Sequence, residues 1–349
     1  MDTITLPTAA DMHIHLRQGS LMTMVTPAVA EGGVSICYVM PNLQPTISNT
    51  EMAVAYKAEL EALSPKVTFL MSLYLNPALT PDEIRKAAKA GVRGVKSYPR
   101  GVTTNSESGI ESYDIYYPVF QAMEEEGMVL NLHGEIPSDP DKNVCVMNAE
   151  EKFLSHLKDI HLAFPKLKII LEHATTEAAV KMVKSLGDTV GCTITVHHLQ
   201  LIVDDWAGKC HNFCKPVAKY PSDRAALRNV IKEGKFFLGT DSAPHPSHRK
   251  EGPDSCAGVF TTPLVLPYLA TILESFGALD RLRGFACDFG RAFYEVKNEK
   301  WVGEVKLVRE EWNAPQKYSF GGEGIVGEKG DVVPFMAGKP LGWKIASIN

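Results

Sequence analysis

The sequence lacks the features that mark three common classes of protein. It has no run approaching the roughly 18 apolar residues that a membrane-spanning helix needs. Residues 1–6 carry no basic segment followed by an apolar stretch, so no secretory signal is expected. Basic residues are not in excess, because 36 Lys and Arg stand against 41 Asp and Glu, for a net charge of −5. We therefore expect a cytoplasmic protein that acts on a small molecule, binds no nucleic acid and enters no membrane.

Cysteine is scarce and irregularly spaced. The seven cysteines are an odd number without the dense pattern of a disulfide framework, so we expect free thiols in a reducing compartment. Cys210, His211 and Cys214 have a spacing that resembles part of a zinc finger, but no second ligand pair follows. A loop is the favoured interpretation of this segment, with a structural zinc site as the alternative.

The sequence does contain a regular alternation of short apolar, β-branched runs and amphipathic helical segments. This pattern is typical of a parallel sheet with crossover helices. Eight strands are predicted, over Ala9–His15, Val34–Met40, Val67–Leu75, Val92–Tyr98, Met128–His133, Lys168–His173, Val190–Val196 and Phe236–Thr240. Helices are predicted between them, for example over 80–90, 115–126 and 175–186, and after them near 262–276 and 280–295.

Eight strand–helix units predict an α/β fold, a (β/α)₈ TIM barrel. The 349 residues, of which 45% are hydrophobic, suffice for one such barrel with one large core. We expect a single domain over 1–349, with a short, polar, Gly-rich C-terminal extension from about residue 300.

Metal-ligand residue types recur at the ends of the predicted strands, where barrels of this kind carry their catalytic residues. His13 and His15 are two residues apart, so both face the same side of a strand and can reach one metal ion. His133 and His173 end the fifth and sixth strands, and Asp241 follows the eighth. Each alone has an ordinary structural explanation, but their joint occurrence predicts a metal site.

Lys96 ends the fourth strand, which is otherwise apolar. Burial there would lower the pKa of its amine. A neutral amine can react with carbon dioxide, and the resulting carbamate, N6-carboxylysine, offers two oxygens that can bridge two cations. A lysine that extends its ammonium to solvent is the alternative.

These features together resemble the amidohydrolase superfamily and, within it, the short monofunctional dihydroorotases, over nearly the whole chain. The motifs that carry the resemblance are Asp11-Met12-His13-Ile14-His15-Leu16-Arg17, Met40-Pro41-Asn42, Val95-Lys96-Ser97-Tyr98-Pro99, Leu132-His133-Gly134-Glu135, Glu172-His173-Ala174-Thr175-Thr176 and Gly239-Thr240-Asp241-Ser242-Ala243-Pro244-His245. The resemblance implies reversible cyclisation of N-carbamoyl-L-aspartate to L-dihydroorotate in pyrimidine biosynthesis, by a homodimer.

The resemblance also implies a site and its cofactors. Two Zn²⁺ ions per subunit, with a hydroxide shared between them, would be held by His13, His15, carboxylated Lys96, His133, His173 and Asp241. Asp241 would serve as general acid and base.

For the substrate, the family implies that Arg17, Asn42 and His245 bind its α-carboxylate and that the backbone near Ala257 contacts the ring. A guanidinium suits a carboxylate because it donates two parallel hydrogen bonds. Thr103 and Thr104 lie in a polar loop after the fourth strand, which is expected to close over the open-chain substrate.

Three alternatives remain open at this point. Another cyclic-amide hydrolase, such as a dihydropyrimidinase, hydantoinase or allantoinase, would share the metals but would not need Arg17, Asn42 and His245. A non-catalytic barrel relative would be expected to lack metal ligands. In a mononuclear deaminase-like enzyme Lys96 would have no role. His197 and His198 stay unassigned, as residues that orient a ligand or simply pack.

Overall fold

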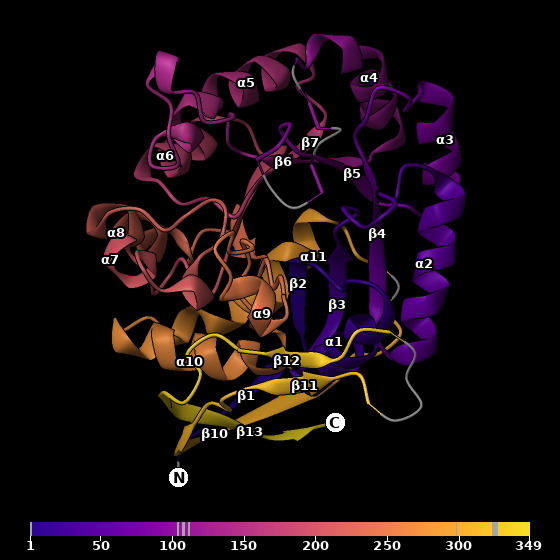
Figure 1. Cartoon of the computed structure of the whole chain (residues 1–349). Coiled ribbons are helices and arrows are strands. Elements are labelled where there is room, and N and C mark those ends of the chain that lie inside the picture. Colours follow the sequence, from indigo (N-terminus) through magenta and orange to yellow (C-terminus); the bar gives the residue numbers. More distant parts are fainter. Residues whose placement is uncertain (1, 103–104, 107–108, 111, 298, 323–326) are drawn as a thin grey trace.

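A computed structural model describes residues 2–102, 105–106, 109–110, 112–297, 299–322 and 327–349 (Figure 1). Its centre is an eight-stranded parallel sheet in the order β2-β3-β4-β5-β6-β7-β8-β9. The strands are β2 (Ala9–Ile14), β3 (Val34–Val39), β4 (Thr68–Tyr74), β5 (Gly94–Ser97), β6 (Val129–His133), β7 (Lys168–Glu172), β8 (Val190–Ile194) and β9 (Phe236–Leu238). The predicted (β/α)₈ barrel is confirmed, and each predicted strand is present with its ends trimmed by no more than two residues.

Helices surround the barrel (Figure 1). They are α1 (Gly19–Glu31), α2 (Thr50–Leu63), α3 (Pro81–Lys89), α4 (Tyr117–Glu126), α5 (Ala149–Ala163), α6 (Glu177–Ser185), α8 (Pro221–Val230) and α10 (Val265–Ser275), with the short α7 (Val203–Trp206), α9 (Ser247–Lys250) and α11 (Phe289–Phe293). Local signals define their ends. Thr80 and Thr176 accept hydrogen bonds from backbone N–H groups in the first turns of α3 and α6, and α4 ends at Gly127 in the left-handed region, φ 66°.

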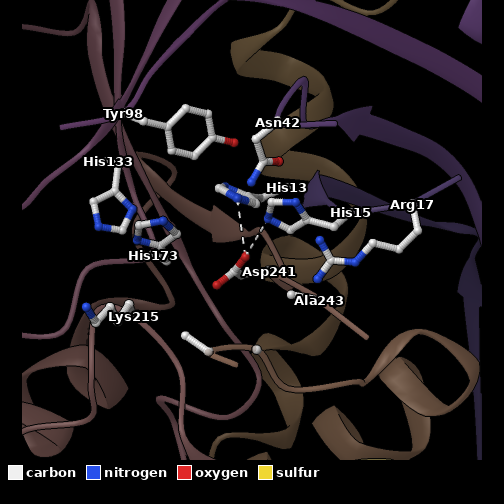
Figure 2. A pocket seen from close by; sticks show the side chains of 12 residues that line it. His13, His15, Arg17, Asn42, Tyr98, His133, His173, Lys215, Asp241 and Ala243 are labelled. Atoms are coloured by element: carbon white, nitrogen blue, oxygen red, sulfur yellow. Dashed lines mark hydrogen bonds and ion pairs between the residues drawn. The ribbon is translucent and has the colours of Figure 1, made fainter. Parts of the chain in front are cut away.

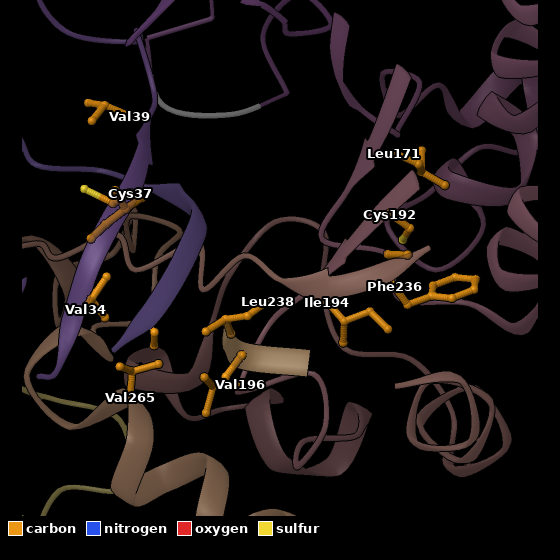
Figure 3. Close-up of a cluster of buried hydrophobic side chains, with 14 of the residues drawn as sticks. Val34, Cys37, Val39, Leu171, Cys192, Ile194, Val196, Phe236, Leu238 and Val265 are labelled. Carbon is orange, nitrogen blue, oxygen red and sulfur yellow. The ribbon is translucent and has the colours of Figure 1, made fainter. Parts of the chain in front are cut away.

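Two apolar clusters hold the barrel together, because successive side chains of a strand point to opposite faces. Cys37 and Val39 of β3 belong to the large cluster that joins the strands to the surrounding helices (Figure 3). Ile36 and Tyr38 belong to a second cluster, with Phe237 of β9 and Tyr294 just after α11. Both faces of each strand are thereby buried, which explains why these strands read as continuous apolar runs.

The ring of strands closes between β2 and β9. Ile14 and Ser242 form a parallel bridge, and the backbone N–H of Asp241 donates to the carbonyl of His13 at 2.8 Å. The carboxylate of Asp11 accepts from both the backbone N–H and the hydroxyl of Thr240, at 2.8 and 2.6 Å. Since β9 has only three residues, the segment after it completes the closure and brings Asp241 against His13.

The C-terminal extension forms a sheet that the sequence analysis did not predict. β10 (Glu304–Asn313) pairs on one side with β1 (Thr3–Pro7) and on the other with β13 (Pro340–Ile348), all antiparallel. β11 (Tyr318–Phe320) and β12 (Gly330–Val332) form a separate two-stranded sheet. Within the described ranges, the structure contains no helix long and apolar enough to cross a bilayer.

Candidate active site

A small cavity opens at the carboxyl ends of the barrel strands (Figure 2). Its walls combine metal-ligand types with cationic, amide and aromatic side chains. They are His13, His15, Arg17, Asn42, Tyr98, His133, His173, Lys215, Asp241, Ala243, Ala257 and Gly258. Five of the six predicted metal ligands therefore line one cavity, and the sixth, Lys96, is fully buried in β5.

His13, His15 and Asp241 form the tightest group of ligand atoms in the cavity. Oδ1 of Asp241 lies 3.0 Å from Nε2 of His15 and 3.4 Å from Nε2 of His13. One ligand atom from each residue lies within 4.8 Å of the other two, which is close enough for all three to bind one ion. The closure of β2 against β9 creates this group.

Buried carboxylates fix the orientation of two histidines. Nδ1 of His13 lies 2.7 Å from Oε2 of Glu172, so its Nε2 is left for the cavity. Nε2 of His133 lies 2.8 Å from Oε2 of Glu135, which leaves its Nδ1. A carboxylate on the far nitrogen of an imidazole is the usual support of a metal-binding histidine, because it sets the tautomer and the ring angle.

Lys96 is a buried amine without a hydrogen-bond partner among the described residues. Its Nζ lies 5.0 Å from the centre of the Tyr98 ring. Burial lowers the pKa of Lys96 to about 8, although the charges of Glu172 and Asp241 act in the opposite direction. An amine that loses its proton this easily and lacks partners fits the predicted carbamate, whose oxygens would take up the missing interactions.

The protonation states of His15, His173 and Asp241 suit the binding of a cation. Burial lowers the pKa of His15 to about 4 and that of His173 well below its ordinary value, so both rings are neutral near pH 7. Burial alone would raise the pKa of Asp241, but the hydrogen bond with His15 and the nearby imidazoles outweigh it and hold this pKa well below its usual range. Neutral imidazoles beside an ionised carboxylate suit Zn²⁺.

Three residues of the site adopt a backbone conformation that is costly for residues other than glycine. Arg17, His173 and Asp241 have φ angles of 62°, 41° and 47°, in the left-handed region. Each follows a barrel strand, where the chain turns away. Such strain persists only where the surrounding structure enforces it, and it gathers at functional sites.

The predicted carboxylate-binding residues occupy two layers. Arg17 and Asn42 line the cavity, and so does Ala257, whose backbone was predicted to contact the ring, whereas His245 is not among the lining residues. His245 lies behind Arg17, with its Nε2 3.1 Å from an Arg17 nitrogen and 3.1 Å from the Ala257 carbonyl oxygen. This nitrogen cannot accept from the guanidinium and donate to the carbonyl at once, so one tautomer of His245 satisfies Arg17 and the other satisfies Ala257.

Thr103 and Thr104 lie outside the described residues. Their described neighbour Asn105 contacts the rim of the cavity: its amide donates to the Asn42 carbonyl oxygen at 2.9 Å, and Gln44 donates to its side-chain oxygen at 2.7 Å. Asn105 thus lies next to Asn42, which lines the cavity.

Sequence reasoning assigned no role to Glu135, Glu172, Tyr98 or Lys215. The two glutamates could have been found, since each lies within two residues of a predicted histidine ligand. Tyr98 follows Lys96 at the two-residue spacing of a strand. Lys215 has no such signal, because it lies in an irregular segment between a 3₁₀ helix and α8.

The suggested Cys210–His211–Cys214 cluster does not form. Cys214 instead groups with His197 and His198, with one ligand atom of each within 4.8 Å of the others. Both Nε2 of His198 and the Cys214 thiol bond to the carbonyl oxygen of Pro216, at 3.0 and 3.2 Å. All seven cysteines are free, as predicted.

Comparison with known families agrees with this geometry. A family model described as Amidohydrolase matches residues 11–249. Together with the barrel and the ligands at its strand ends, this match defines the chain as an amidohydrolase.

Similarity to individual proteins shows which family of amidohydrolases the chain belongs to. The chain is 54% identical to the dihydroorotase of Mycosarcoma maydis and 47% identical to that of Saccharomyces cerevisiae, in each case over 98% of both chains. A crystal structure of dihydroorotase from Saccharomyces cerevisiae in complex with 5-fluoroorotic acid superposes with a TM-score of 0.93 at 46% identity, over 99% of this chain and 98% of that one. The chain belongs to the dihydroorotase family.

Proposed function

We propose that the protein catalyses the reversible cyclisation of N-carbamoyl-L-aspartate to L-dihydroorotate, a step of pyrimidine biosynthesis. The observation that carries this proposal is the presence of Arg17 in the same cavity as His13, His15 and Asp241. A hydrolase of neutral cyclic amides would have no use for a buried guanidinium beside its reactive centre, whereas both proposed substrates carry an α-carboxylate. The family membership supports the same reaction.

The ligand set supports a two-zinc centre held by His13, His15, His133, His173, Asp241 and Lys96 as its carbamate. Zinc bound there would polarise the ring carbonyl and make a bound water more acidic. The buried Nζ of Lys96, without a hydrogen-bond partner in the described part of the chain, is the observation that best supports the carbamate.

Asp241 has the position and the charge of a general base. Its carboxylate, which lies beside His13 and His15 in the cavity, takes a proton from the water that attacks the ring carbonyl. When the amide C–N bond breaks, the same carboxyl group delivers that proton to the ring nitrogen. In the cyclisation direction Asp241 accepts the proton of the ureido nitrogen and passes it to the departing oxygen, which leaves as hydroxide. A proton from solution converts this hydroxide to water, so cyclisation consumes one proton overall and is favoured as the pH falls.

Arg17, Asn42 and the backbone of Ala257 hold the substrate. The guanidinium is itself fixed, because its Nε donates to the Pro244 carbonyl oxygen at 2.9 Å. Its remaining N–H groups are directed at the α-carboxylate, and His245 supports them through its contact with an Arg17 nitrogen.

Thr103 and Thr104 close over the reacting carboxylate. Replacing both with alanine is expected to lower kcat without changing the zinc content, and unchanged kinetics would refute the lid role.

The decisive experiment is an assay of the purified protein, with its metal content determined, on L-dihydroorotate beside dihydrouracil, hydantoin and allantoin. Turnover of L-dihydroorotate alone is expected. Preference for the neutral rings would overturn the assignment of Arg17. A protein that is inactive and binds no metal even after zinc is added would support a non-catalytic barrel.

We also propose a homodimer in the cytoplasm, which sedimentation and cell fractionation test directly.

A further inference from the structure

Lys215 lines the cavity, yet the reaction described above gives it no role. It is half-buried and lies on the side of His133 and His173, whereas Arg17 lies on the opposite side, with Asp241 between the two cations (Figure 2). Arg17 and Lys215 are the two cationic side chains among the residues that line this cavity. They line it on opposite sides of Asp241 (Figure 2).

The backbone around Lys215 is anchored by buried groups. The carbonyl oxygen of Pro216 accepts from Nε2 of His198 and from the thiol of Cys214, and the carbonyl oxygen of Phe213 accepts from Nζ of Lys250 at 2.9 Å. His198 and Cys214 therefore support the segment that carries Lys215. Such support limits where the ammonium can go.

The ammonium of Lys215 has no hydrogen bond or ion pair with any residue that the structure describes. Glu135 is near enough to feel its charge, but the carboxylate of Glu135 is buried against Nε2 of His133 at 2.8 Å. A cation that is held at the wall of a cavity and is not paired within the protein is available to an anionic ligand.

The two proposed substrates differ in the number of their carboxylates. N-carbamoyl-L-aspartate has two, and L-dihydroorotate has one, because ring closure turns the second carboxylate into a neutral amide. Arg17 accounts for the carboxylate that both molecules share. A second cation on the far side of Asp241 matches the carboxylate that only the open-chain molecule carries.

We propose that Lys215 pairs with the carboxylate that closes the ring, in the open-chain substrate and in the anionic tetrahedral transition state, but not with the carbonyl of the closed ring. This inference rests on the proposed function. It makes Lys215 the residue that distinguishes the dianionic substrate from the monoanionic one.

The proposal predicts an uneven division of effects between kcat and KM. The equilibrium constant of the reaction is unchanged by any substitution, so kcat/KM must fall by the same factor in both directions. In the synthetic direction the loss should appear as a higher KM for N-carbamoyl-L-aspartate, because the contact exists in both the bound substrate and the transition state. In the hydrolytic direction it should appear as a lower kcat with an unchanged KM for L-dihydroorotate.

The experiment measures initial rates in both directions and zinc content for the wild type, Lys215→Met, Lys215→Gln and Lys215→Arg. Lys209→Met is the matched control, since Lys209 is exposed nearby and bonds to the Asp204 carbonyl oxygen. For the Met and Gln variants we expect kcat/KM to fall roughly 10- to 100-fold, as is typical of the loss of a charge-assisted hydrogen bond. The fall should appear as a higher KM in synthesis and as a lower kcat in hydrolysis. The Arg variant should recover part of the loss, and the control should match the wild type.

Three results would overturn the inference. The first is unchanged kinetics in both neutral variants. The second is a lower kcat/KM that comes from an equal rise of KM in both directions. The third is a lower kcat/KM that follows the loss of bound zinc. A wild type that turns over neither substrate would instead refute the proposed function, and the inference with it.

Discussion

Single residues set which ring nitrogen of His13 and of His133 is left free for the proposed metal. His13 and His133 are both paired with a buried carboxylate, yet through opposite ring nitrogens: Nδ1 in His13 and Nε2 in His133. The carboxylate of Glu172 also accepts from the amide of Asn131 at 2.6 Å and from the hydroxyl of Thr193. Because Glu172 is held on three sides, the ring of His13 is held as well.

Glu172→Gln should therefore weaken metal binding without unfolding the protein. Glutamine keeps the size of the side chain but loses the charge that stabilises the Nδ1–H tautomer of His13. Loss of such a supporting carboxylate typically lowers metal affinity 10- to 100-fold. Zinc retention during competition with a chelator measures the effect. Glu177→Gln, at an exposed position of α6 paired with Lys181, is the control, and equal retention by both variants would contradict the prediction.

Lys96 gives the metal-free protein a characteristic pH dependence. Its pKa is about 8 in the folded chain, against an ordinary value of 10.5. Between these values the unfolded chain binds a proton that the folded chain does not, so stability rises with pH across that window. Wild type should gain up to about 3 kcal/mol over Lys96→Met between pH 8 and 10.5. Urea unfolding in carbonate-free buffer measures the difference, and parallel curves would disprove the assigned burial.

At the scale of elements, the sequence predicted the barrel well because both faces of its strands are buried. Continuous apolar runs such as Val34–Val39 follow directly from that burial, and ligands at strand ends could be located before the structure was known. The turns that aim Arg17, His173 and Asp241 could not be predicted, since their left-handed conformations depend on contacts between distant segments.

The terminal sheet escaped prediction for a different reason. β10 mixes charged and apolar residues, and of its ten residues only Val305 and Leu307 are buried. Its partner β1 lies about 300 residues earlier in the chain. A pattern read within a short window cannot reveal such a pairing.

Lys215 was missed because its place in the cavity is set by the buried contacts of its neighbours.

Trp343 of β13 should be the main point at which this sheet stabilises the barrel. Its side chain is 1% exposed, its Nε1 donates to Glu274 of α10 at 3.0 Å, and the guanidinium of Arg309 lies 4.7 Å from its ring. Trp343→Ala should cost about 3–5 kcal/mol, as is typical of a buried aromatic. Urea unfolding measures this loss, and kcat at low urea should stay unchanged. Trp301→Ala, at a partly exposed site, should cost less, and an equal cost would contradict this role.

At the scale of the whole molecule, the proposed metal centre would link strands that are far apart in the ring. The predicted ligands lie in or just after β2, β5, β6, β7 and β9, whereas the barrel and its helices are held together by the two apolar clusters. The barrel should therefore form without metal but be less stable.

Removal of the metal by a chelator is expected to abolish activity, preserve the far-UV circular dichroism spectrum and lower Tm. Zinc at 100 times its Kd should restore about 2.7 kcal/mol of stability per site. A zinc titration followed by thermal unfolding tests this, and a Tm that does not respond to saturating zinc would contradict it.

The pairing of β1 with β10 also bears on how the chain folds as it is made. During translation β1 leaves the ribosome long before β10, so its backbone hydrogen-bonding groups stay without their final partners while the whole barrel is synthesised. An unpaired strand edge invites association with other chains. β1 limits this exposure by being only five residues long and ending in Pro7, and its capture by β10 is a late event in the biogenesis of the protein.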